Sequence, residues 1–90
     1  MNPVLKKKLK AQAHALNPVV MIGQAGLTEE VLKEINIALD VHELIKIRIR
    51  AERDERKEIS SEIAQSTQAE NIQSIGQIAV FYRKNLKKAW

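Results

Sequence analysis

The strictest constraint on the fold is a run of seven residues in the middle of the chain, LIKIRIR at 44–50. Isoleucines at alternate positions are separated by the cations Lys46, Arg48 and Arg50. Side chains of a β-strand point alternately to the two faces of its sheet. The run is therefore predicted to be a strand with one apolar face and one basic face. Such a strand needs a core on one side of its sheet and accepts cations on the other.

Helical and extended patterns alternate on either side of this run. An Asn-Pro pair at 2–3 is a helix-start signal, and a second at 17–18 ends that helix, because the residue before proline avoids helical geometry. The sequence VVMI at 19–22 has no polar residue, which is typical of a strand buried on both faces. Thr28 is the expected cap of a second helix that continues to about His42.

The C-terminal half completes the expected fold. A third helix should run from Asp54 to about Gln68, and the glycine in the middle of 71–83 predicts a hairpin of two strands. Strands joined through helices are normally parallel, whereas hairpin strands are antiparallel. We predict one α/β domain over 1–90, ordered α-β-α-β-α-β-β. Three helices and a mixed four-stranded sheet would form an α+β-like, two-layer arrangement with a loosely held basic tail at 84–90.

Composition excludes several classes of protein. Ninety residues suffice for one domain. The absence of cysteine excludes a disulfide framework and a thiolate zinc site. No stretch is apolar enough to span a bilayer, and the N-terminus lacks the apolar segment of a secretory signal. We expect a cytoplasmic monomer with no cofactor and no membrane partner.

The net charge of +4 is modest, but its distribution is informative. Three basic blocks, 1–26, 44–53 and 71–90, carry net charges of +4, +3 and +4, and the two segments between them carry −4 and −3. A fold that gathers the basic blocks on one face would present a surface for nucleic acid. The same charges also suit an ordinary solvated surface, so a second signal is needed.

No set of residues specifies an enzyme. His14 and His42 fall on or near helices and have no identifiable partner for acid–base chemistry. Glu29, Glu30 and Glu34 open a helix, where acidic residues are common, and are a weak metal signal. The sequence contains neither a phosphate-loop lysine nor a dinucleotide glycine pattern.

The loop GQAG at 23–26 is the one segment with a binding mechanism. It joins a predicted strand to a helix start, where backbone N–H groups and the helix dipole attract anions. Glycine at both ends lets the main chain approach a phosphate, and such a GxxG loop clamps nucleic-acid backbone in KH domains. Because the same four residues could form an ordinary turn, the surrounding basic segments decide the interpretation.

The residues around this loop resemble a known family. VMIGQAGLT at 20–28, followed by apolar residues at helical spacing and by HELIK at 42–46, resembles the CRM domain. IGQIAVFYR at 75–83 resembles the closing hairpin of that domain. As a free-standing copy, the chain is similar to the YhbY family of RNA-binding proteins. The resemblance implies a fold like the C-terminal domain of translation initiation factor three and association with precursors of the large ribosomal subunit.

These signals together predict a non-enzymatic protein that grips RNA backbone. The resemblance departs at Gln24 and Ala25, which are neutral where the family loop often carries a lysine, so other cations would have to supply the charge. With three aromatic residues in all, base stacking should contribute less than phosphate contacts. The predicted RNA-binding residues are the loop residues Gly23, Gln24, Ala25 and Gly26, the helix lysines Lys6, Lys7 and Lys10, the strand cations Lys46, Arg48 and Arg50, and the C-terminal cations Arg83, Lys84 and Lys87.

Two other functions remain open from the sequence. The basic blocks could dock a protein with an acidic surface, which direct binding to purified RNA would distinguish. The glycine loop could serve as the anion hole of a small phosphate-ester enzyme, although no base or metal set accompanies it. The sequence does not determine which RNA is bound or which basic blocks share a face with the loop.

Overall fold

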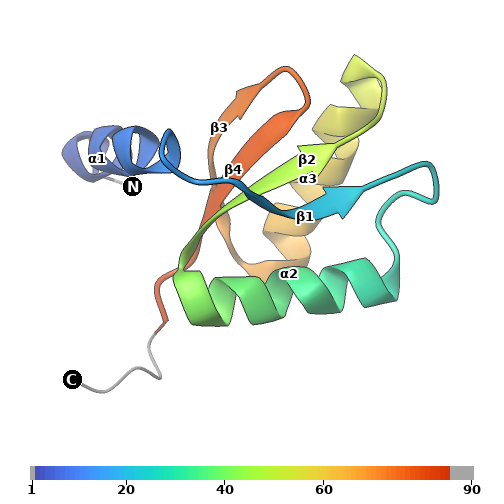
Figure 1. The fold of residues 1–90 in the computed structure, drawn as a ribbon, viewed down its shortest axis with the longest axis horizontal. Coiled ribbons are helices and arrows are strands. Elements are labelled where there is room, and N and C mark those ends of the chain that lie inside the picture. The colour runs from blue at the N-terminus through green and yellow to red at the C-terminus, as the bar shows by residue number, and fades with distance from the viewer. Residues whose placement is uncertain (1, 86–90) are drawn as a thin grey trace.

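A computed structural model of the chain describes residues 2–85 and contains the predicted elements in the predicted order. They are α1 (Pro3–Ala13), β1 (Pro18–Ile22), α2 (Glu29–His42), β2 (Leu44–Ile49), α3 (Arg53–Thr67), β3 (Glu70–Ile75) and β4 (Ile78–Tyr82). The strands form one mixed sheet in the order β1-β2-β4-β3 (Figure 1). β1 is parallel to β2, and β4 is antiparallel to both of its neighbours. The predicted fold class is confirmed.

The predicted helix starts and the predicted hairpin turn are present in the structure. The Asn2 side chain accepts a hydrogen bond from the Val4 N–H at 2.8 Å, and the Thr28 hydroxyl accepts one from the Val31 N–H at 3.2 Å. These caps satisfy N–H groups that have no partner inside the helix. The turn between β3 and β4 contains Gly76 at φ +55°, a conformation that favours glycine.

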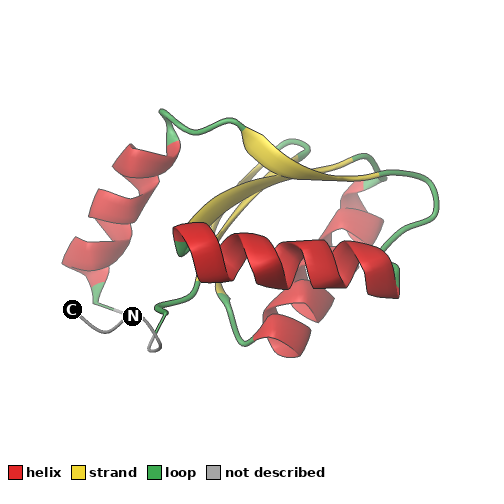
Figure 2. Ribbon diagram, turned by 60° about the horizontal axis from the view of Figure 1, so that its bottom comes forward, coloured by secondary structure: helices red, strands yellow, loops and turns green. Residues whose placement is uncertain are grey.

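The main core lies between one face of the sheet and the helices α2 and α3 (Figure 2). Ile45, Ile47 and Ile49 of β2 are each at most 1% exposed and belong to the same cluster as Ile35 and Leu39 of α2. Burial of each such side chain contributes about 1.5–3 kcal/mol. The apolar face of strand 44–49 therefore lies in the core, as its alternating pattern predicts.

The opposite face of the sheet is covered at one end only. Leu9 and Ala13 of α1 pack against Ile72 of β3 and Val80 of β4, forming a second, smaller cluster. Leu44 of β2 packs against the same cluster, so α1 lies over β3, β4 and the start of β2 and leaves the β1 side of the face open.

The prediction that the strand at 19–22 is buried on both faces is wrong. Val20 and Ile22 point into the main core, but Val19 and Met21 are 50% and 54% exposed. β1 is an edge strand that pairs with β2 alone, and α1 packs against β3 and β4 instead of covering it. An unbroken apolar run therefore contributes one buried and one open face.

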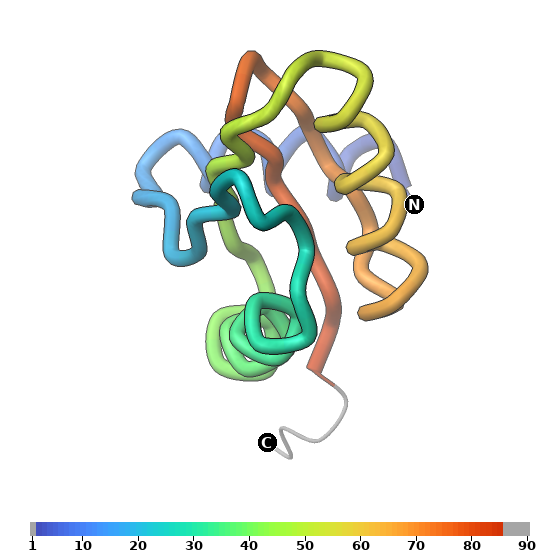
Figure 3. The backbone as a smooth tube through the Cα atoms, turned by 90° about the vertical axis from the view of Figure 1, so that its right-hand side faces the viewer, coloured from blue at the N-terminus to red at the C-terminus, as the bar shows by residue number. Residues whose placement is uncertain are grey.

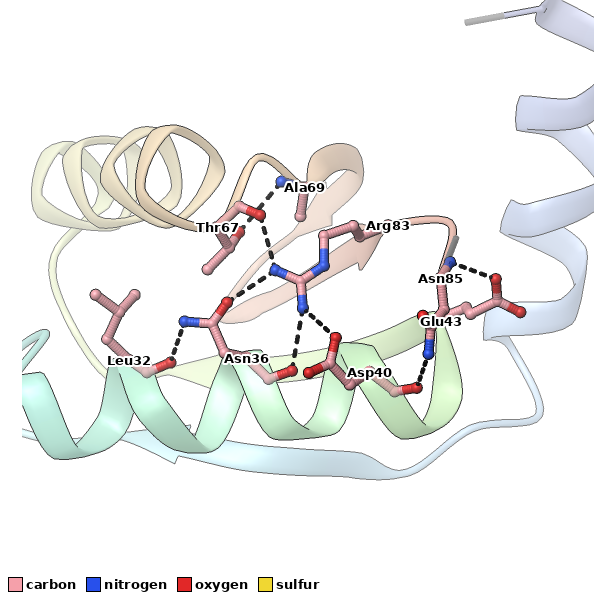
Figure 4. A network of polar contacts seen from close by, with 8 residues as sticks. All are labelled: Leu32, Asn36, Asp40, Glu43, Thr67, Ala69, Arg83 and Asn85. Atoms are coloured by element: carbon pink, nitrogen blue, oxygen red, sulfur yellow. Dashed lines mark hydrogen bonds and ion pairs between the residues drawn. The ribbon is translucent and has the colours of Figure 1, made fainter. Parts of the chain in front are cut away.

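Arg83, directly after β4, connects three elements through hydrogen bonds of its side chain (Figure 4). Its guanidinium donates to Asn36 Oδ1 at 2.8 Å, to the Thr67 carbonyl at 2.8 Å and to Asp40 Oδ1 at 2.9 Å. It also donates to the Asn36 carbonyl at 3.1 Å. The side chain therefore connects α2, the C-terminal end of α3 and the end of β4. Because the Asp40 carboxylate is 64% exposed, the neutral acceptors matter more than the ion pair.

We expect Arg83→Gln to lower the free energy of unfolding by about 2 kcal/mol, because part-buried acceptors on Asn36 and Thr67 would lose their donor. Denaturant unfolding followed by circular dichroism measures the change. Lys84→Gln is the matched control, since Lys84 is exposed, and it should change stability by less than about 0.5 kcal/mol. Equal stability of the Arg83 variant and the parent would contradict this role.

Candidate nucleic-acid interface

The glycine loop forms a tight turn at the end of β1. The Gly26 N–H donates to the Gly23 carbonyl at 3.0 Å, and Gly26 has φ +73°. A side chain at Gly26 would be strained by that backbone conformation. Gly23 has no positive φ, and a Cβ built on it would meet no atom within 4 Å. The backbone conformation therefore favours glycine at 26 but does not constrain residue 23, where a glycine allows the close approach of a ligand.

Two backbone donors of this turn are unused. Gln24 and Ala25 are exposed, and their N–H groups make no hydrogen bond to any residue in the described range. Successive free N–H groups in a turn form a small concave site that suits an anion. The N–H of Gly26 is not part of this site, since the turn itself uses it.

The helix after the loop contributes less than the sequence predicts. α2 begins at Glu29, three residues beyond Gly26, and its first turn contains Glu29 and Glu30. These carboxylates already lie at the positive end of the helix dipole. They would also repel a phosphate, so the helix start gives no direct help to an anion at the turn.

The basic run of β2 leads to the loop, where it ends at Arg50. Lys46 and Arg48 alternate with the buried isoleucines and so lie on the sheet face opposite the main core. Arg50 follows the end of the strand, where its N–H donates to the Ile22 carbonyl at 2.9 Å. It lines the same hollow as Gly23, Gln24 and Gly26. Arg50 is therefore a neighbour of the loop, whereas Lys46 pairs with Pro18 at the far end of β1.

Both cations within the strand keep unused hydrogen-bonding capacity. The Lys46 ammonium donates to the Leu16 carbonyl at 3.1 Å, and an ammonium has two further donors. The Arg48 Nε is buried yet has no hydrogen-bond partner among the described residues. Such an unsatisfied buried donor is uncommon in folded proteins.

The charge around the loop is not uniform. Glu52 and Glu55 line the loop hollow on the side of α3. A phosphate is disfavoured beside these carboxylates and favoured beside Arg50, which lines the same hollow. The structure therefore gives the loop one acidic and one basic flank.

Three further cations near the loop end were not predicted from the sequence. Arg53, Arg56 and Lys57 of α3 line a hollow together with Gly76 and Gln77 of the β3–β4 turn. Gln77 also lines the loop hollow, so the two hollows adjoin. The basic block at 44–53 was a signal for Arg53, but the direction of the α3 side chains depends on how that helix packs.

The lysines of α1 lie far from the loop. Figure 1 has the longest axis of the molecule horizontal, an extent of 39 Å, and places α1 at one end and the β1–α2 loop at the other. Figure 3, viewed from the loop end, shows α1 behind the sheet. Lys6, Lys7 and Lys10 therefore do not join the loop in one compact site.

The C-terminal cations are also separated from the loop. Tyr82 pairs with Leu44, so β4 ends where β2 begins, at the opposite end of the sheet. The Arg83 guanidinium is engaged within the protein, whereas Lys84 is exposed. Lys87 lies outside the described residues.

Other kinds of site find no support in the part of the chain that the structure describes. No three His, Asp or Glu side chains within residues 2–85 gather as ligands for a metal ion. None of the helices in that range combines the length and apolar character that crossing a bilayer requires.

Known proteins share both the sequence and the fold. The chain is 45% identical over 83 residues to "Probable RNA-binding protein PA4753" of Pseudomonas aeruginosa, covering 91% of this chain and 80% of that one. It is 51% identical over 79 residues to "RNA-binding protein" of Haemophilus influenzae, covering 87% and 80%. The solution structure of SAV1595 from Staphylococcus aureus is similar, with a TM-score of 0.84 and 30% identity over 99% of this chain and 94% of that one.

A family model agrees with these similarities. The model of the CRS1 / YhbY (CRM) domain matches residues 1–83, which include every helix and strand of the structure. The chain belongs to the CRS1 / YhbY (CRM) domain family.

Proposed function

We propose that this protein binds structured RNA through the sugar–phosphate backbone, without catalysing a reaction, as a monomer in the cytoplasm. The observation that carries the proposal is the meeting of an exposed turn that has two free N–H groups with Arg50, which directly follows the basic strand β2. Relatives of the chain are named as RNA-binding proteins, which supports RNA as the ligand.

The proposed contacts start at the turn. A phosphate oxygen accepts hydrogen bonds from the N–H groups of Gln24 and Ala25, and the Arg50 guanidinium adds a charge-assisted bond. Arg48 and Lys46 follow along β2 at alternate positions, spaced by roughly 6.6 Å from the rise of about 3.3 Å per residue. From Arg50 at the turn, Arg48 and Lys46 continue along one face of β2 and can contact the backbone of one RNA strand.

The proposal divides the predicted basic residues into two groups. Lys46, Arg48 and Arg50 belong to the surface that starts at the loop, and Arg83 is excluded because its guanidinium serves the fold. The α1 lysines lie at the far end of the molecule from the loop. They would contact the RNA only if the RNA extends along the length of the protein.

We further propose that the RNA is that of large ribosomal subunit precursors, supported by what resemblance to the family implies. Sedimentation of a cell lysate through a sucrose gradient, followed by immunoblotting, tests this. The protein should sediment with particles smaller than the mature large subunit and shift to the top after RNase treatment. Recovery only at the top of the gradient, even at low salt and after crosslinking, would remove the ribosomal assignment but not general RNA binding.

The loop is tested by a matched pair of substitutions at Gly23, where a side chain fits without strain. Gly23→Asp places a negative charge beside the bound phosphate, and we expect roughly tenfold weaker binding to a stem-loop RNA. The slope of log affinity against log salt should fall by about 0.7–0.9, equivalent to one phosphate contact. Fluorescence anisotropy at several salt concentrations measures both values.

Gly23→Asn has nearly the same shape without the charge and should lose less affinity than Gly23→Asp. Gln24→Lys should tighten binding and steepen the salt slope, because it adds a cation at the turn. Equal affinities for the Asp and Asn variants, in proteins with the parent's melting temperature, would mean that no phosphate lies at the loop.

A further inference from the structure

The open part of the α1-side sheet face contains a second feature that the backbone-binding proposal does not use. Between the C-terminal end of α1 and the sheet lies a hollow of about 200 Å³. Its apolar walls are Ala13 of α1, Ile75 of β3, and Ile78 and Val80 of β4. Ile75 is 59% exposed, whereas Ala13 and Val80 are 1% and 2% exposed, so the surface open to solvent is mainly that of the isoleucines. We call this feature the α1 hollow.

Three polar side chains join the apolar walls of the α1 hollow. They are His14 at the end of α1, Lys46 of β2 and Gln73 of β3. An amide offers both a donor and an acceptor, an imidazole offers a flat ring, and the Lys46 ammonium has donors beyond its bond to Leu16. A mostly apolar hollow with a few convergent polar groups is characteristic of a ligand site.

The α1 hollow is continuous with the proposed phosphate site. Ile78, one of its walls, is the cross-strand partner of Arg48, and Arg48 in turn pairs with Met21 of β1. Cross-strand neighbours on one face lie about 4.5–5.5 Å apart at Cβ. Arg48, whose buried Nε has no partner, therefore lies between the hollow and the loop. Lys46 belongs to both the basic face of β2 and the hollow.

We propose that the α1 hollow binds an unpaired nucleobase of the same RNA whose backbone lies on β2 and the loop. The proposal rests on the proposed function and extends it from backbone to base recognition. The base lies against the isoleucine walls and the His14 ring, and its edge exchanges hydrogen bonds with the Gln73 amide. Single-stranded bases are recognised through stacking and edge hydrogen bonds of this kind. The cations beside the hollow match the phosphates that flank the base.

Two RNAs with the same number of phosphates distinguish base recognition from backbone binding. One is a stem interrupted by unpaired adenosines, and the other is a fully paired duplex. We expect the parent protein to bind the RNA with unpaired adenosines more tightly. Gln73→Leu, which keeps the size of the side chain but removes its amide, should reduce that preference roughly fivefold and leave duplex binding unchanged.

His14→Ala is a second variant at an exposed helix end and should also reduce the preference. Gln65→Leu makes the same chemical change at an exposed position of α3 and is the matched control. Melting temperatures measured alongside show that each variant is folded. A parent that binds both RNAs equally, or a preference unchanged in folded Gln73 and His14 variants, would overturn the nucleobase site and leave the loop proposal intact. Binding to neither RNA would overturn both proposals.

Discussion

Ile45, Ile47 and Ile49 are buried against α2 and α3, and this burial determines the face of the sheet on which the remaining side chains of β2 lie. The side-chain period of a strand is two, so a shift of one residue would bury the cations and expose the isoleucines. Hydrophobic burial in the core thereby holds Lys46 and Arg48 on the opposite face. The proposed binding surface is thus a consequence of core packing, and a stable domain keeps its cations aligned without a separate scaffold for them.

The incomplete cover of the second face is equally important for the proposed functions. α1 packs on Ile72 and Val80 and leaves the β1 side of the face open, where Met21 is exposed. A helix placed across the whole face would hide Arg48. The edge position of β1 also brings the glycine loop to the rim of the sheet beside Arg50. The fold therefore places backbone donors, cations and open apolar surface along one connected region.

Local patterns predicted most of the fold because local interactions determine it. Helix caps at Asn2 and Thr28, the alternation along β2 and the glycine turn before β4 each have a short-range physical cause. The burial of β1 was predicted wrongly because an apolar run does not reveal whether a strand lies at the edge of a sheet. That position depends on the whole topology.

The candidate site was predictable in its parts but not in its assembly. The loop and the strand cations carried sequence signals, whereas their meeting at Arg50 depends on the parallel pairing of β1 and β2. Long-range contacts also explain why the role of Arg83 was not predicted, since the sequence alone indicates a surface cation. Its role in the fold depends on Asn36 and Thr67, which lie 47 and 16 residues away along the chain.

RNA backbone is proposed to contact the protein at the glycine loop and Arg50, and backbone amide NMR shifts measure such contacts residue by residue. Titration of the labelled protein with a fully paired RNA duplex should move the amide signals of Gln24, Ala25 and Arg50 most. The signals of Lys6 and Lys7, at the far end of the molecule, should move least. Large shifts confined to α1, with the loop signals unchanged, would contradict the proposed interface.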